Sequence, residues 1–170
     1  LKNLFDVGSV HTLRNYVDYL EEAYLVLIAR RFSYKLKETP KSPRKVYVVD
    51  SAFIEPSNLN SPDFGRRMEN AVAVELTRRG YPLHYWKERG EVDFVVKGRS
   101  GVECLIQVTR ELKDDNYRRE VGNLVEAGKR LGVKKLLLIT WDQEEKLNES
   151  GMTVEVVPLW KWLLGGKVCT

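Results

Sequence analysis

One glutamate stands where an apolar residue is expected. Glu69 leads a helical stripe that continues with Val72, Ala73 and Leu76, three, four and seven residues further on. This spacing predicts an amphipathic helix and places Glu69 on its apolar face instead of its solvated face. Because a carboxylate on an apolar face needs a partner or a chemical role, Glu69 is the first candidate site residue.

Two polar side chains occupy comparable positions on predicted strands. In residues 91–97, alternation puts Asp93 on the face opposite Val92, Phe94 and Val96. In residues 103–109 it puts Gln107 beside Leu105 and Thr109 and opposite Ile106 and Val108. Two carboxylates and an amide oxygen are hard ligands that suit Mg²⁺ or Mn²⁺. Such an ion could polarise a phosphate and lower the pKa of an attacking water. The pattern therefore predicts a metal site at Glu69, Asp93 and Gln107.

The same carboxylates also fit a purely structural interpretation. Isolated carboxylates are common on amphipathic elements, either at the surface or as buried ion-pair partners of arginine. Several arginines lie close to Glu69 and Asp93 in the sequence. Spacing alone leaves the metal site and the ion pair equally open.

The elements that would position these residues follow from periodicity and turn residues. Apolar residues at helical spacing, together with caps, predict helices over residues 10–22, 64–79 and 116–131. Strands are expected over residues 25–29, 45–50, 82–86, 91–97, 103–109, 135–141 and 153–157. The first two strands form a hairpin with a long basic tip, the strands from 82 to 109 form a meander, and the whole order predicts an α/β layer structure.

Bulk properties narrow the class of protein. A length of 170 residues suits one domain with a small appendage, and no apolar run approaches the ~20 residues of a membrane span, so we expect a cytoplasmic protein with no membrane partner. Cys104 and Cys169 have neither metal-ligand nor disulfide-framework spacing, which fits a reducing compartment. The chain begins at leucine near a structured segment, so we expect the natural protein to continue upstream.

The positive charge is concentrated in one segment. The net charge is +4, yet residues 30–45 alone carry seven basic residues and one acidic residue. Five of the basic residues belong to the hairpin: Lys35, Lys37, Lys41, Arg44 and Lys45. Such a segment either binds nucleic-acid phosphates or is a solvated loop that keeps the protein soluble.

Several motifs in order carry a resemblance to a known family. They occupy residues 9–13, 19–26, 45–50, 65–72, 85–86, 91–96, 105–109, 118–120 and 157–164. Together they resemble the C-terminal domain of unknown function of archaeal and bacterial AAA-type ATPases. The resemblance implies a partial winged helix over residues 1–55 and a restriction-endonuclease-like PD-(D/E)XK domain over residues 62–170. It also implies an upstream P-loop ATPase domain, whose motif is absent from this chain.

The resemblance assigns nuclease roles residue by residue. Glu69 matches the helix glutamate, Asp93 the first aspartate of the motif, and the stretch from Gln107 to Thr109 the (D/E)XK tripeptide. Gln107 retains a metal-binding oxygen but removes one negative charge, and Thr109 cannot supply the amine of the missing lysine. The basic residues that might replace that amine are Arg110, Lys113, Arg118 and Arg119.

The resemblance also implies contact with DNA. In a winged helix one helix enters the major groove and the hairpin contacts the backbone. Thr12, Arg14 and Asn15 lie off the apolar stripe of the first helix and could face DNA. We therefore expect a DNA-binding, nuclease-like region of an ATPase that cleaves phosphodiesters with Mg²⁺ or Mn²⁺ and whose partners include further copies of itself in a homo-oligomer. The alternative is a catalytically inactive module that binds nucleic acid or protein and regulates the ATPase.

Overall fold

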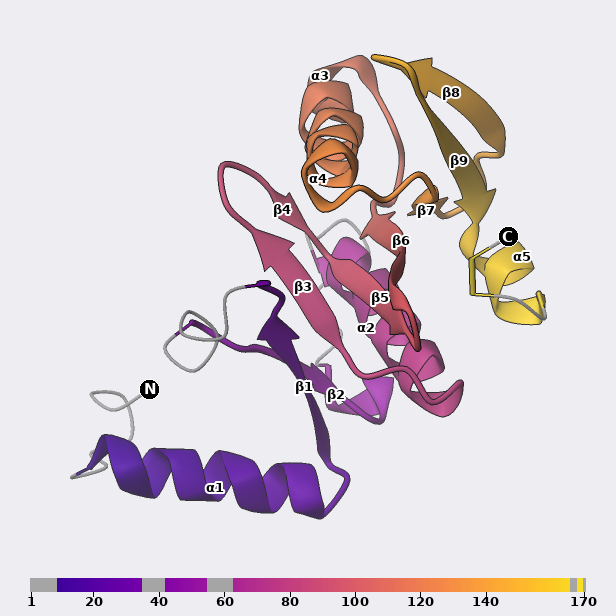
Figure 1. The fold of residues 1–170 in the computed structure, drawn as a ribbon. Coiled ribbons are helices and arrows are strands. Elements are labelled where there is room, and N and C mark those ends of the chain that lie inside the picture. Colours follow the sequence, from indigo (N-terminus) through magenta and orange to yellow (C-terminus); the bar gives the residue numbers. More distant parts are fainter. Residues whose placement is uncertain (1–8, 35–41, 55–62, 166–167, 170) are drawn as a thin grey trace.

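The fold combines two mixed sheets with helices, as seen in a computed structural model (Figure 1). The structure describes residues 9–34, 42–54, 63–165 and 168–169. The helical elements are α1 (Val10–Glu22), η1 (Ser51–Phe53), α2 (Asp63–Arg78), α3 (Asp114–Tyr117), η2 (Arg118–Gly122), α4 (Asn123–Leu131) and α5 (Leu159–Leu164). The strands are β1 (Val26–Arg31), β2 (Lys45–Val48), β3 (His84–Lys87), β4 (Glu91–Val92), β5 (Phe94–Gly98), β6 (Gly101–Val108), β7 (Leu136–Thr140), β8 (Glu145–Glu149) and β9 (Met152–Pro158). This confirms the predicted α/β class.

The first helix and hairpin form where the sequence predicts them. The Ser9 hydroxyl accepts a hydrogen bond from the backbone N–H of His11, which caps α1, and β1 pairs antiparallel with β2. The apolar stripe at Val10, Leu13, Val17, Leu20 and Tyr24 predicts that one face of α1 is buried, and this is wrong, because no described side chain of this helix is buried. Leu20 of the predicted stripe is 41% exposed and Tyr24, just beyond the helix, is 78% exposed. Leu13 and Val17 are half-buried, so the described part of the chain covers that face only in part.

The hairpin joins a sheet with later strands. The first sheet has the order β2-β1-β3-β4, and Arg30 of β1 pairs in parallel with His84 of β3. Strands from both sides of the predicted boundary at residues 56–62 therefore share one sheet. The division into residues 1–55 and 62–170 stays a prediction.

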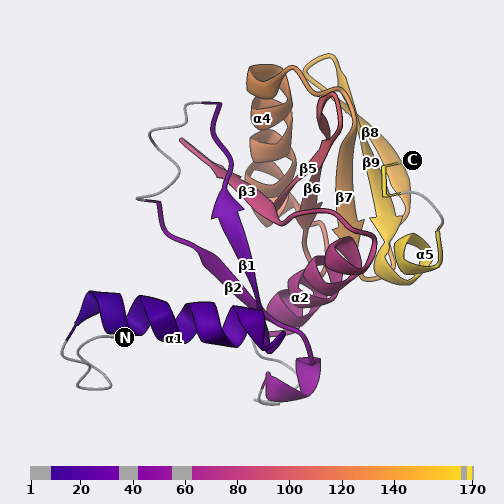
Figure 2. The ribbon, with the colours of Figure 1, turned by 60° about the horizontal axis from the view of Figure 1, so that its bottom comes forward.

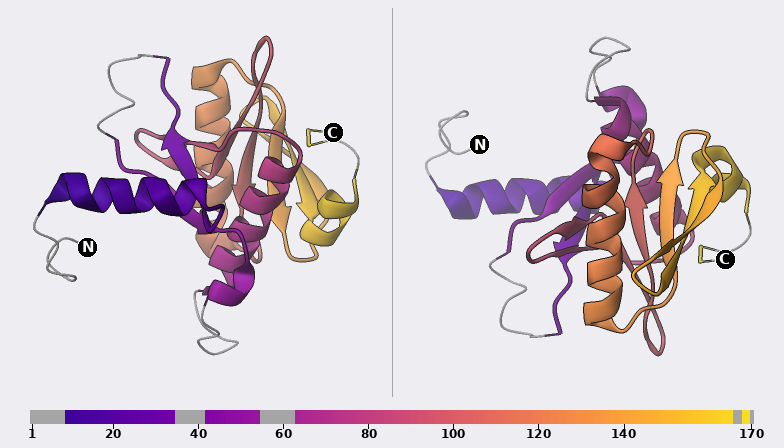
Figure 3. Two further views of the ribbon diagram at one scale, coloured as in Figure 1. Left: turned by 90° about the horizontal axis from the view of Figure 1, so that it is seen from below. Right: turned by 90° about the horizontal axis from the view of Figure 1, so that it is seen from above.

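The second sheet is a layer between helices. Its order is β5-β6-β7-β9-β8, and Figures 2 and 3 show α2 and α4 on opposite sides of it. Alternation along β7 explains this arrangement, because Leu137 and Ile139 pack with α2 and α5, whereas Leu136 and Leu138 pack with α4. Strand β8 was not predicted, because none of its residues is buried and most of them are polar.

The predicted strand over residues 91–97 is broken at Asp93. Glu91–Val92 belongs to the first sheet and Phe94–Gly98 to the second. The expectation that Val92 and Phe94 share a face is therefore wrong: Val92 packs in the cluster beneath α4, and Phe94 packs in the cluster beneath α2. The antiparallel connections of the predicted meander are present, but they are divided between two sheets.

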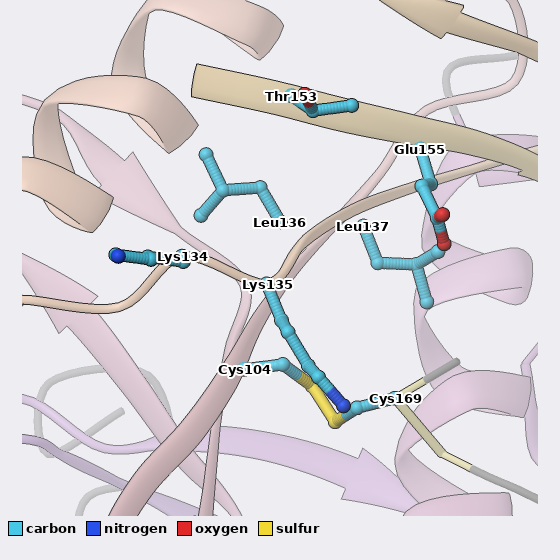
Figure 4. Close-up of a pocket in the computed structure, with 8 residues that line it drawn as sticks. All are labelled: Cys104, Lys134, Lys135, Leu136, Leu137, Thr153, Glu155 and Cys169. Atoms are coloured by element: carbon cyan, nitrogen blue, oxygen red, sulfur yellow. A yellow bond between two sulfur atoms is a disulfide. The ribbon is translucent and has the colours of Figure 1, made fainter. Parts of the chain in front are cut away.

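The two cysteines form a disulfide. The Cα atoms of Cys104 and Cys169 are 6.1 Å apart, and the bond ties the end of the chain to β6 beside Lys135 (Figure 4). The expectation of a reducing compartment rested on unpaired cysteines and therefore loses its basis. No local sequence signal indicated the disulfide, because 65 residues separate the two cysteines. No helix in the described ranges combines the length and apolar character that a membrane span requires.

Candidate functional site

A lysine lies at the centre of three carboxylates. The Lys45 ammonium is 3.0 Å from Glu69 Oε1, 2.8 Å from Glu91 Oε1 and 2.9 Å from Asp93 Oδ1. We call these four residues the carboxylate cluster. With every group ionised, these four residues have a net charge of −2, and the Lys87 ammonium, 2.7 Å from Glu91 Oε2, offsets one further negative charge. An excess of negative charge remains.

Strand β2 delivers two groups to the cluster from one face. Lys45 and Tyr47 are two residues apart, so their side chains point the same way. The buried Tyr47 hydroxyl donates a 2.6 Å hydrogen bond to Glu69 Oε1, the same oxygen that Lys45 contacts. Burial first and the Glu69 charge second raise the pKa of Tyr47 above its ordinary value, so its hydroxyl keeps its proton. Glu69 is thus held in place by two donors.

Asp93 connects the two sheets. Its Oδ2 accepts a 3.0 Å hydrogen bond from the backbone N–H of Val108, and its own N–H donates to Gln107 Oε1 at 3.2 Å. The break between β4 and β5 makes this possible, because a residue inside a regular strand would spend its backbone groups on the ladder. Asp93 therefore faces Lys45 and Glu69 while it is fixed to β6.

Burial and the neighbouring charges shift the pKa values of the cluster residues in different directions. Burial, and next the Glu69 charge, raise the pKa of Asp93 to about 7, although Lys45 opposes the shift. Burial alone would lower the pKa of Lys45, but Asp93 and Glu69 outweigh it, so the ammonium stays charged. Burial would raise the pKa of Glu91, but hydrogen bonds from Lys45 and Lys87 hold it below its ordinary value. Asp93 is the carboxyl that exchanges its proton near neutral pH.

Behind Asp93, a second buried carboxylate holds Gln107. Gln107 Nε2 donates a 2.8 Å hydrogen bond to Glu120 Oε2, and Arg119 contacts Glu120 Oε1 at 2.6 Å. The side chain of Glu120 is only 4% exposed. It projects from η2, a π-helical turn inside the predicted helix over residues 116–131, and such turns are frequent at functional sites. Sequence reasoning missed Glu120, and the Arg118–Glu120 motif was the one signal that pointed to it.

The basic residues predicted to replace the missing lysine at Thr109 do not belong to the carboxylate cluster. The Thr109 hydroxyl donates to the Glu111 carbonyl at 3.4 Å, Lys113 pairs with the Glu111 carboxylate, and Arg119 pairs with Glu120. An amine does lie beside Glu69 and Asp93: it belongs to Lys45, which was expected on the DNA-binding hairpin.

The other predicted DNA-binding residues that the structure describes do not contact the cluster. Thr12, Arg14 and Asn15 belong to α1, which packs against the β1–β2 hairpin and away from the second sheet (Figure 1). Arg44 pairs with Asp18 of α1 at 3.4 Å. Lys35, Lys37 and Lys41 lie outside the described residues.

The three carboxylates are ligands of the type that a divalent cation prefers, but in this structure they contact the Lys45 ammonium. In the parts of the chain that the structure describes, no three His, Cys, Asp or Glu side chains form a group that could hold a metal ion. In the cluster, the Lys45 ammonium occupies the point at which the three carboxylates meet. A metal ion would be held by Glu69, Asp93 and Glu91 only after this ammonium moves aside. Gln107 as a metal ligand stays a prediction, because its oxygen already accepts the Asp93 N–H.

Comparisons with known proteins identify relatives of this chain. A family model described as a domain of unknown function, DUF4143, matches residues 64–162. "Uncharacterized protein MJ1544" of Methanocaldococcus jannaschii is 37% identical over 167 residues, and an "Uncharacterized protein" of Haemophilus influenzae is 29% identical over 158 residues. Each alignment covers 92% of this chain but only 37% and 38% of the relatives, so the chain spans about two fifths of their length. No solved structure matches significantly. Because the family model covers more than half of the residues, Glu69, Asp93 and Gln107 among them, the chain belongs to the DUF4143 family.

Proposed function

We propose that this chain is a nuclease-like module that cleaves phosphodiesters at the carboxylate cluster with a divalent cation. The observation that carries the proposal is the Lys45 ammonium, 2.8 to 3.0 Å from three carboxylates. It supplies the basic group that the stretch from Gln107 to Thr109 lacks. The restriction-endonuclease-like fold that the sequence resembles is part of this proposal.

Each member of the cluster has a role in this proposal. Glu69, Asp93 and Glu91 hold Mg²⁺ or Mn²⁺, which when bound polarises the phosphate and acidifies water. The displaced Lys45 ammonium, on the same cluster, neutralises charge that develops on a phosphate oxygen. Gln107 and Glu120 act as positioning residues that hold the backbone of Asp93.

Incubation with nucleic acid tests this function directly. The full chain is mixed with linear and branched DNA and with Mg²⁺, Mn²⁺ or EDTA. We expect cleavage that requires metal, is lost in Asp93→Ala and Lys45→Ala, and persists in Lys146→Ala, whose side chain is 72% exposed on β8. Absence of cleavage by the wild-type chain, or equal cleavage by Asp93→Ala, would end the proposal.

A second candidate is a non-catalytic module that regulates its own ATPase. Two observations favour it: the Lys45 ammonium already satisfies the three carboxylates, and α1 exposes Tyr16 and Tyr19, at 53% and 62%. Exposed aromatic side chains on one helix suit a protein interface. In this candidate α1 packs on another part of a longer polypeptide or on a second subunit.

Calorimetric titration with Mn²⁺ separates the two candidates. The nuclease-like module binds Mn²⁺, and the binding is lost in Glu69→Gln and in Asp93→Asn. The regulatory module binds no Mn²⁺ that depends on either carboxylate. Retained folding of both variants is checked by circular dichroism.

The remaining partners are also part of the proposal. We infer contact with DNA through the basic hairpin and α1, an upstream P-loop ATPase domain in the same polypeptide, and a cytoplasmic location. A cytoplasmic disulfide must be shielded from reductants, and Cys104 is fully buried. Alanine at Lys35, Lys37 and Lys41 should weaken DNA binding in a salt-dependent way.

A further inference from the structure

An exposed tryptophan lies at the end of a fully buried strand. All five residues of β7 are buried, yet Trp141, which follows directly, is 51% exposed. Its backbone N–H donates to the Arg110 carbonyl at 3.0 Å, which fixes the start of its loop to the end of β6. Trp141 is therefore a large apolar ring held at the surface by an ordered backbone.

Two neighbours give this ring a defined surrounding. The Phe64 ring, at the start of α2, lies edge to face with Trp141 at a centroid distance of 4.9 Å. The Arg110 guanidinium lies over the Phe64 ring, 4.9 Å from its centroid. Arg110 is exposed and pairs with no carboxylate among the described side chains. We call Phe64, Arg110 and Trp141 the aromatic platform.

Beside the platform the surface is hollowed and carries further cations. The hollow is lined by Thr109, Arg110, Glu111, Lys113, Asp115, Asn116 and Arg119. Three of these residues are basic and two are acidic. Lys113 pairs with Glu111 and Arg119 pairs with the buried Glu120, so Arg110 is the cation most available to an anion. Lys113 and Arg119 are 57% and 72% exposed and can turn toward a ligand.

The platform lies at the same end of the fold as the carboxylate cluster. Arg110 is two residues beyond Val108, whose N–H bonds Asp93, which corresponds to about 7 Å along a strand. Phe64 precedes Glu69 by five residues, roughly 7 Å along the axis of α2. A polymer bound at the cluster would reach the platform with its neighbouring units.

We propose that the aromatic platform stacks an unpaired base, so that the substrate is single-stranded nucleic acid or a strand end. The inference rests on the proposed phosphodiester chemistry and adds the class of substrate. A base offers its flat face to Trp141 only when it is not stacked within a duplex, while Arg110 meets the adjoining phosphate. An aromatic ring beside an unpaired guanidinium suits this combination of a planar ring and an anion better than it suits an apolar peptide.

Binding without metal tests the platform separately from cleavage. A fluorescein-labelled oligothymidylate is titrated with the full chain in EDTA, by anisotropy and by quenching of tryptophan fluorescence. We expect Trp141→Ala to weaken binding on the order of tenfold, since stacking on an aromatic side chain has about this effect. Trp141→Phe should retain part of the affinity. Trp160→Ala is the matched control, because Trp160 is 58% exposed on α5.

Two further arms identify what the platform recognises. An abasic oligonucleotide of the same length should bind wild type and Trp141→Ala equally, because it has no base to stack. Arg110→Ala should reduce the slope of log affinity against log salt concentration by about one, which corresponds to the loss of one phosphate contact. Equal oligothymidylate affinity of wild type and Trp141→Ala, an equal loss in Trp160→Ala, or no binding by wild type would overturn the inference. None of these results depends on cleavage, which is scored only with metal present.

Discussion

Replacing Lys45 with methionine removes the ammonium that contacts all three carboxylates of the cluster. Methionine keeps the length of the side chain but leaves Glu69, Glu91 and Asp93 facing one another. Removing one partner of a buried ion pair costs about 3–5 kcal/mol. Here the Lys45 and Glu69 side chains are each 22% exposed, so water screens part of the repulsion, and we expect a loss of about 2–3 kcal/mol. For a chain of this size that loss lowers Tm by about 4–12 °C.

The repulsion in Lys45→Met should depend on pH and on metal. Lys45 lowers the pKa of Asp93, so in Lys45→Met this pKa should lie above its wild-type value of about 7; Asp93 then takes up a proton as the pH falls, and the destabilisation should shrink. Mn²⁺ should stabilise Lys45→Met more than it stabilises wild type, because no ammonium competes for the carboxylates. A bound ligand at 100 times its Kd adds about 2.7 kcal/mol, which would restore most of the loss.

Thermal unfolding followed by circular dichroism, in EDTA and in Mn²⁺, measures both effects. Lys87→Met is the matched control: Lys87 also pairs with Glu91, at 2.7 Å, but its side chain is 58% exposed. Its loss should stay within about 0.5 kcal/mol. If Lys45→Met unfolds at the same temperature as Lys87→Met, with or without Mn²⁺, then Lys45 does not hold the cluster together and our reading of the site is wrong.

Two other predictions follow from buried groups. Folding raises the pKa of Asp93 from 3.8 to about 7, so between these pH values the folded state binds a proton that the unfolded chain releases. The free energy of unfolding should therefore decline as the pH rises from about 4 to about 7. Urea unfolding measured across this range should show the decline in wild type and not in Asp93→Asn. A Cβ at Gly128 would lie 2.9 Å from Leu136 Cδ2 and Met152 Cε and 3.0 Å from the Val133 carbonyl oxygen; because the backbone oxygen cannot turn away as the side-chain ends can, Gly128→Ala should cost about 1–3 kcal/mol in denaturant unfolding. Gly122→Ala, whose nearest contact would be 3.8 Å away, should not be destabilised, and equal losses in the two variants would contradict the packing argument.

The local elements of this protein were predictable because their causes are local. The Ser9 cap and the apolar spacing predicted α1, and alternation with turn residues predicted β6 and β7. The polar edge strand β8 was missed for the same reason: edge strands are stabilised by one neighbour, here β9, and need no buried face.

Part of the candidate site was predictable as well. Glu69 and Asp93 were singled out because each interrupts an apolar pattern, and both contact Lys45 in the structure. The faces of a helix and a strand can be read from sequence, since both periods are short. Whether the two carboxylates bind a metal ion or only pair with the lysine is a separate question that titration with Mn²⁺ answers.

The tertiary structure alone decided which cation faces these carboxylates. Sequence placed Lys45 with the basic hairpin, yet the parallel pairing of β1 with β3 brings the neighbouring strand β2 beside α2 and the β4–β5 break. Contacts such as Lys45 with Asp93, Glu120 with Gln107, and Cys104 with Cys169 join residues distant in sequence or on different elements. Such contacts depend on how sheets and helices stack, whereas sequence periodicity reports only which face of its own element a residue occupies.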